Sequence, residues 1–108
     1  MPSILPGDGP LTLPQSLTIK NILAVHELIL SAVGDNSTTI LDVPEDAQVD
    51  LSFVQLVTAA RDHAQAKAGQ VLLARPAAGD LYDVLKRGGF LDDMTPDTAD
   101  FWLHQEKV

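Results

Sequence analysis

The chain has 108 residues and no cysteine, and its seven lysine and arginine residues face fifteen aspartate and glutamate residues, for a formal net charge of −8 at pH 7. Phosphate backbones and anionic membranes repel such a chain, and without cysteine there are no disulfides, thiolate nucleophiles or zinc–thiolate sites. Hydrophobic residues make up 45% of the chain and charged residues 20%, which predicts one globular domain. With neither a signal peptide nor an apolar run of membrane-spanning length, we expect a cytoplasmic protein that neither inserts into membranes nor binds nucleic acid.

Strand and helix patterns alternate along the first part of the chain. Residues 1–9 carry two prolines and two glycines and are predicted to form a flexible lead-in. Alternating apolar and polar residues predict a short strand at 11–13, and the chain is expected to stay extended through 16–19. A helix is predicted over 20–33, because apolar residues recur there at three- and four-residue spacing and a glycine follows. The apolar stripe of this helix consists of Ile22, Leu23, Val25, Ile29, Leu30 and Val33.

The middle of the chain holds a predicted strand and a long predicted helix. β-branched and apolar residues predict a buried strand at 38–43, and a polar loop follows over 44–48. Asp50 is a residue type that caps helices, so a second helix is predicted to begin at Leu51 and to run to about Lys67. Its buried face is predicted to consist of Phe53, Val54, Val57, Ala60 and Ala64.

A strand at 70–74, a short helix after Asp80 and a last helix from Pro96 complete the predicted elements. Short connections between alternating strands and helices predict an α/β domain over residues 10–91. It should hold a mixed, partly parallel sheet of about four to five strands, with about three to four helices, because parallel neighbours need helical crossovers. Residues 92–108 are predicted to form a helical extension packed on the same domain. The predicted common core consists of Leu41, Val57, Ala60, Leu73 and Leu85.

Ser52 is the candidate functional residue, because it lies in the first turn of the second predicted helix. N–H groups without intrahelical partners, together with the positive end of the helix dipole, make such a turn favourable for a phosphate. Sites cluster in loops beyond the carboxyl ends of parallel strands, and residues 44–52 follow a predicted strand on that side. An ordinary cap at Asp50 and an ordinary first-turn serine would give the same pattern, so the assignment depends on further context.

Four segments follow one another in a recognisable order. They are Ile40 to Val43, Asp50-x-Ser52, Gly69 before Val71 to Leu73, and Leu81-x-x-Val84-Leu85 before Gly88 to Leu91. This order resembles the STAS domain, a family that includes anti-sigma-factor antagonists and the tails of sulfate transporters, and the resemblance covers roughly residues 10–91. In phosphorylated members the motif reads Asp-Ser-Ser-Gly, and the second serine accepts the phosphate. Here Leu51 and Phe53 replace the first serine and the glycine, which removes a hydroxyl and a site of close backbone approach.

The resemblance implies a non-enzymatic signalling protein with Ser52 as the phosphoacceptor and Asp50 as its support. The partner would be an ATPase or serine-kinase-type anti-sigma factor, or a chemotaxis-type kinase, which supplies the phosphoryl chemistry. No catalytic residue, cofactor or metal is then expected in this chain. Phosphorylation would add about −1.5 to −2 charge and repel an acidic or apolar partner face. Partner contacts are expected from Glu45, Asp46, Gln48, Leu51, Phe53, Val54 and Gln55, and a monomer is expected when the partner is absent.

A constitutive scaffold is the main alternative function. An unphosphorylated STAS subunit of a chemotaxis-type or transporter ATPase complex would share every feature of the fold. Only the chemistry at Ser52 separates the two functions.

Other phosphotransfer classes fit the sequence less well. Asp42 at a strand end and Arg75 after a later strand are weakly similar to a response-regulator receiver domain. Such a domain needs two acids after its first strand to hold magnesium, whereas Pro14 and Gln15 stand there, and Arg75 replaces the usual lysine. His26 is an unfavourable phosphoacceptor candidate, because phosphorylated histidines usually lie exposed on a helical bundle and this chain has an alternating strand–helix pattern. The other histidines, His63 and His104, are interpreted as solvated side chains, since neither belongs to a catalytic cluster.

Overall fold

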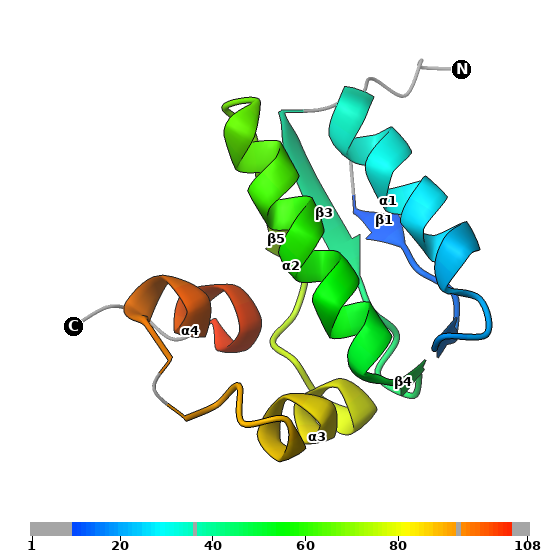
Figure 1. Cartoon of the computed structure of the whole chain (residues 1–108), viewed down its shortest axis with the longest axis vertical. Helices are drawn as coiled ribbons and strands as arrows, with labels where there is room; N and C mark the ends of the chain where they lie inside the picture. Colours follow the sequence, from blue (N-terminus) through cyan, green and yellow to red (C-terminus); the bar gives the residue numbers. More distant parts are fainter. Residues whose placement is uncertain (1–9, 36, 93, 105–108) are drawn as a thin grey trace.

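The computed structural model describes residues 10–35, 37–92 and 94–104, and these residues form an α/β fold (Figure 1). The predicted lead-in at 1–9 and the end of the predicted extension, 105–108, lie outside the described residues. The elements are β1 (Leu11–Thr12), β2 (Ser16–Leu17), α1 (Ile22–Asp35), β3 (Thr38–Asp42), β4 (Gln48–Val49), α2 (Leu51–Ala66), β5 (Gln70–Leu73), α3 (Gly79–Arg87) and α4 (Pro96–Leu103). The predicted α/β class is confirmed, whereas the predicted mixed sheet of four to five strands is in fact two separate parallel sheets of three and two strands.

The strands are divided between two sheets, and every described strand pair is parallel. The larger sheet has the order β1-β3-β5, so β3 is its central strand, and the smaller sheet pairs β2 with β4. Pro14 separates β1 from β2, and proline cannot donate a ladder hydrogen bond. Strands of the two sheets alternate along the chain. β1, β3 and β5 belong to the larger sheet, and β2 and β4 belong to the smaller one.

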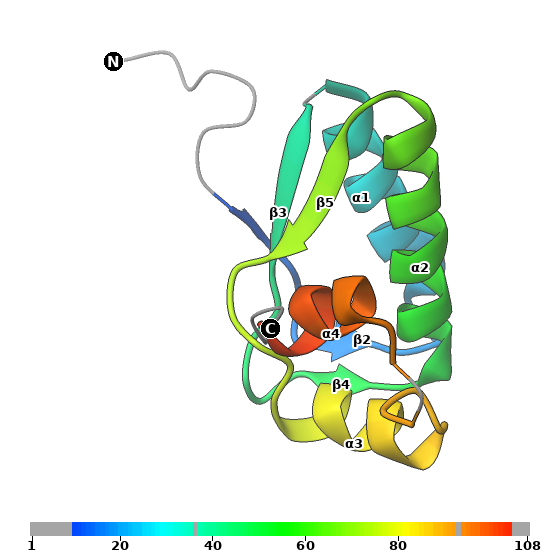
Figure 2. The same cartoon turned by 90° about the vertical axis from the view of Figure 1, so that its left-hand side faces the viewer.

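Helices α1 and α2 cover one face of the larger sheet, as Figure 2 shows. Each helix links two neighbouring parallel strands, and such crossovers share one hand, so both lie on the same side. Side chains alternate across a strand, so Leu41 faces the helices and is fully buried, whereas Ile40 on the other face is only half-buried. The five predicted core residues, Leu41, Val57, Ala60, Leu73 and Leu85, are all buried in one cluster.

The two edges of the larger sheet differ in what surrounds them. The edge strand β1 lies between Pro10 and Pro14. At the other edge, α4 lies beside β5, where the ring Nε2 of His104 is 3.0 Å from the carbonyl oxygen of Leu73. The aromatic rings of Phe101 and Trp102 join the common core from α4. Helix α4 is therefore held on the domain by core contacts as well as by this hydrogen bond.

Candidate functional site

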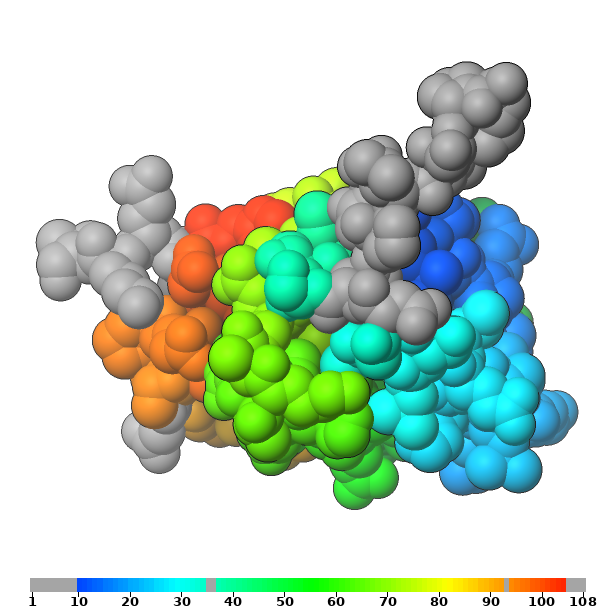
Figure 3. Space-filling model, turned by 90° about the horizontal axis from the view of Figure 1, so that it is seen from above, coloured from blue at the N-terminus to red at the C-terminus, as the bar shows by residue number. Residues whose placement is uncertain are grey.

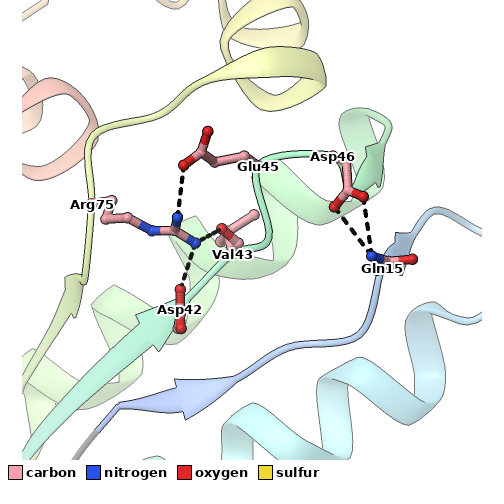
Figure 4. A network of polar contacts seen from close by, with 6 residues as sticks. All are labelled: Gln15, Asp42, Val43, Glu45, Asp46 and Arg75. Atoms are coloured by element: carbon pink, nitrogen blue, oxygen red, sulfur yellow. Dashed lines mark hydrogen bonds and ion pairs between the residues drawn. The ribbon is translucent and has the colours of Figure 1, made fainter.

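Arg75 joins the loops that follow two parallel strands (Figure 4). Its guanidinium donates to the carboxylates of Asp42 at 2.8 Å and Glu45 at 2.9 Å, and to the carbonyl oxygen of Val43 at 2.9 Å. The planar fork of arginine suits several acceptors at once. The Arg75 side chain, which follows β5, thereby connects the end of β5 to the end of β3 and to the loop after it.

Gln15, which directly precedes β2, binds the same loop. Its side-chain amide donates to both carboxylate oxygens of Asp46 at 3.2 Å (Figure 4). Its backbone carbonyl oxygen accepts from the backbone N–H of Gln48 at 2.7 Å. The second contact lies at the first residue of β4. The sequence interpretation had placed Gln48 in a polar loop and predicted no strand there. A strand of two residues is too short to give a periodic signal.

Gly79 brings the start of α3 against this loop. Its φ is +59°, and a Cβ atom there would lie 2.6 Å from the carbonyl oxygen of Glu45, so only glycine fits without movement. A hollow of about 300 Å³ lies beside this contact and includes Arg75, Pro76 and Leu81 in its lining. We name the contacts of Gln15, Asp42, Glu45, Asp46 and Arg75 the strand-end network.

Asp50 caps helix α2, as the sequence predicts. One carboxylate oxygen accepts from the N–H of Ser52 at 3.0 Å and from the hydroxyl of the same serine. The other accepts from the N–H of Ile19 at 2.9 Å. A single carboxylate thus connects the start of α2 with the turn that precedes α1.

The environment of Asp50 keeps its carboxylate ionised. Burial alone would raise the pKa of Asp50. Hydrogen bonds from the Ser52 hydroxyl and from the N–H groups of Ile19, Ser52 and Phe53 outweigh that effect and lower the pKa from its ordinary value of 3.8. The Ser52 hydroxyl therefore donates to a negatively charged oxygen.

Ser52 lies in the first turn of α2 and is half-buried. The sequence predicts an exposed hydroxyl at a helix start, and the structure places it at that start with partial exposure. Because the hydroxyl proton is directed to Asp50, the lone pairs of Oγ stay available for attack on a phosphoryl group. We name Asp50, Leu51 and Ser52, with Ile19 bound to them, the acceptor turn.

The structure divides the expected partner contacts into two groups. The exposed ones are Glu45, Asp46, Gln48, Leu51 and Gln55. Phe53 and Val54 are 0% and 1% exposed, so their expected partner role is wrong. Both point to the core because they share the inner face of α2 with Val57, at three- and four-residue spacing.

Two exposed apolar residues near the acceptor turn were missed as contact candidates. Ile19 is 67% exposed and is held next to Asp50 by its N–H, and Leu23, four residues further on, is 77% exposed. The sequence interpretation placed Leu23 in the buried stripe of its helix, and that placement is wrong. A leucine in the first turn of a helix can satisfy the apolar spacing whether or not that turn contacts the core. Spacing alone therefore could not distinguish an exposed Leu23 from a buried one.

Three further observations concern possible metal ligands, His104 and the helices of the described residues. No three histidine, aspartate or glutamate side chains of residues 10–35, 37–92 and 94–104 are grouped so as to hold a metal ion. His104 is exposed, in agreement with its interpretation as a solvated side chain, and its ring Nε2 also lies 3.0 Å from the carbonyl oxygen of Leu73. None of the helices in these residues combines the length and the apolar character needed to cross a membrane.

Comparison with protein-family models, curated proteins and solved structures gave no match for this chain. The acceptor turn, the strand-end network and the surfaces around them are therefore the features from which a function can be inferred.

Proposed function

We propose that this chain is a non-enzymatic signalling protein of the STAS type that binds an ATPase or serine-kinase-type partner and is switched by phosphorylation of Ser52. One observation carries the proposal. The Ser52 hydroxyl donates to the Asp50 carboxylate at the half-buried start of α2. The partner supplies ATP and the catalytic groups, so this chain needs only to present an oriented hydroxyl.

The surroundings of Ser52 support partner binding. Leu51 is 45% exposed, and Ile19 and Leu23 add further apolar surface on the neighbouring turn. A hollow of about 290 Å³ beside Asp50 and Leu51 also includes Arg87 in its lining. Exposed apolar side chains next to a hollow suit a partner that inserts a side chain of its own.

Phosphorylation would change this surface in two ways. It adds about −1.5 to −2 charge directly beside an ionised carboxylate, and two anions at hydrogen-bond distance repel each other. A phosphate is also a strong acceptor for the free N–H groups of a helix start, so it competes with Asp50 for the N–H of Ser52. Loss of Asp50 from this position also loosens its hold on Ile19. Charge and shape change together, and the partner is released.

A constitutive scaffold is the second candidate, and one observation favours it. The cap of α2 is already complete without a phosphate, because Asp50 takes the N–H of Ser52 and Phe53 is buried behind it. In a scaffold this turn would only shape a permanent docking surface for an ATPase subunit.

The test incubates the full chain and ATP with each serine-kinase-type ATPase of its own organism in turn, and maps any phosphate by mass spectrometry. Ser52→Asp is expected to weaken binding to the kinase by at least about tenfold, and Ser52→Ala to bind constitutively. Ser31→Asp adds the same charge at an exposed serine of α1 and should bind as the parent chain does.

Phosphate on Ser52 together with this order of affinities supports the switch. Equal affinities for the two Ser52 variants, with no phosphate on Ser52, would reject the switch in favour of the scaffold. An equal loss of binding in Ser31→Asp would show that overall charge is responsible, and not the acceptor turn.

A further inference from the structure

A groove of about 430 Å³ runs between helices α1 and α2. The end view in Figure 3 shows the cyan surface of α1 and the green surface of α2 side by side. The groove begins one helical turn beyond Ser52, and neither Asp50 nor Ser52 is among its lining residues. The lining residues used in the argument below are His26, Leu30, Leu56, Ala59, His63 and Lys67.

The charge of this groove is opposite to that of the chain. The chain carries a net charge of −8, yet the described lining contains one lysine, two histidines and no acidic residue. Glu27 and Asp62 are sequence neighbours of the two histidines and do not belong to the lining. An anionic ligand therefore meets less repulsion here than the net charge of the chain implies.

The centre of the groove is apolar and contains small side chains. Leu30 and Leu56 are half-buried in it, Ala59 is exposed, and a Cβ atom at Gly34 would meet no atom within 4 Å. Small side chains let another helix approach closely. An occupant thus finds an apolar strip, with basic side chains along it.

The lining follows the spacing of helical turns. His26, Leu30 and Gly34 are each four residues apart on α1. On the facing side, Leu56, Ala59, His63 and the C-cap residue Lys67 follow one another at three- and four-residue spacing along α2 and its end. At 1.5 Å per residue these stretches are about 12 and 16 Å long, which matches about two to three turns of a docked helix. A surface groove also leaves one side of its occupant in water, which suits an amphipathic helix.

We propose that the groove between α1 and α2 binds an acidic amphipathic helix of a partner protein. Apolar residues of that helix pack on Leu30, Leu56 and Ala59, and its acidic residues face Lys67 and the two histidines. This site is separate from the acceptor turn, so binding here does not require a phosphate-free Ser52.

The test uses two synthetic helical peptides, each about 14 residues long, so that about three turns fill the groove and the frayed ends extend beyond it. Both carry the same leucine and alanine stripe, flanked by glutamates in one and by lysines in the other. Titration into the ¹⁵N-labelled full chain should shift amide signals of α1 and α2 with the glutamate peptide. The lysine peptide should bind at least about tenfold more weakly at low salt.

A pair of variants separates the charge of the groove from the charge of the whole chain. Lys67→Glu and Lys86→Glu each change the net charge from −8 to −10, since one positive charge becomes negative, and both lysines stand at the C-terminal end of a helix. Lys67→Glu should weaken the glutamate peptide at least about fivefold, and Lys86→Glu less than about twofold. Circular dichroism verifies that both variants fold.

Three outcomes would overturn the proposal. One is absence of binding, or equal binding of the two peptides. Another is an equal loss in the two lysine variants, which would indicate general charge attraction. The third is displacement of the glutamate peptide by decanoate at lower concentration, which would assign the groove to a small anionic amphiphile. Failure of the Ser52 switch would leave all these measurements unchanged.

Discussion

The strand-end network and the acceptor turn are neighbouring polar clusters, but they balance charge differently. In the network, the Arg75 guanidinium lies between two carboxylates and a carbonyl oxygen. In the acceptor turn, the Asp50 carboxylate is stabilised by N–H groups and a hydroxyl, and the described contacts to it include no cation. Dipoles lower the pKa of Asp50 without cancelling its charge.

This difference indicates which cluster can respond to a new charge. The pairs around Arg75 already contain both signs, and they hold the ends of β3 and β5 together. The acceptor turn keeps an anion next to the Ser52 hydroxyl oxygen, and no cation is among the described hydrogen-bond partners of that anion, so one further negative group there adds repulsion. Fixed loops on one side and a charge-sensitive turn on the other would suit the proposed switch.

The largest expected effect concerns how the acceptor turn is anchored. Phe53 follows Ser52 and is 0% exposed, so Phe53→Ala should lower the free energy of unfolding by about 3–5 kcal/mol through lost burial and a cavity. Leu51→Ala, on the other side of Ser52, is the control and should cost less than about 1 kcal/mol. Urea unfolding measures both. A loss below about 1 kcal/mol in Phe53→Ala would mean that the core does not anchor the turn.

A smaller effect is expected where α3 meets the strand-end network. Gly79→Ala places a methyl group against the carbonyl oxygen of Glu45 at positive φ, so it should destabilise by about 1–3 kcal/mol. Gly34→Ala is the matched control, because space is open there and the position is helical. It should stabilise by about 0.5–1 kcal/mol. Thermal unfolding that ranked these two variants in the opposite order would disprove the close loop contact.

The smallest effect distinguishes the charge of Asp50 from its role as a cap. The folded-state pKa is lowered, so its stabilisation is fully present above the unfolded value of 3.8 and is lost as pH falls through the folded pKa. Asparagine still caps but carries no charge, so Asp50→Asn should cost about 0.3–1 kcal/mol at pH 7. Urea unfolding from pH 7 to pH 2 should show the two proteins converging. A constant difference would assign the effect to the shape of the cap. Asp62→Asn, an exposed carboxylate on the same helix, is the control.

Much of the fold could be predicted from the sequence, because the long elements have strong periodicity. The helix start at Leu51, the cap at Asp50 and the buried strand that ends at Asp42 agree with their predictions to within a residue. The two-residue strand β4 could not be predicted, since pairing with β2 defines it and no local pattern does.

The candidate site was only partly predictable. The sequence placed Asp50 and Ser52 together, because a cap and a first-turn serine are local features. It could not place Ile19 beside them, since that contact joins residues 31 positions apart in the chain. The partner role given to Phe53 and Val54 was wrong because the same residues were needed for the buried face of α2.

The edges of the larger sheet limit how a partner can bind. Pro10 and Pro14 flank the outer strand β1, and proline offers no N–H to an added strand. Helix α4 lies beside β5, and His104 takes the Leu73 carbonyl oxygen at that edge. Both edges therefore resist the addition of a foreign strand, which is a common route both to peptide capture and to fibrillar aggregation. A partner that binds this protein is therefore expected to use surfaces other than these two edges.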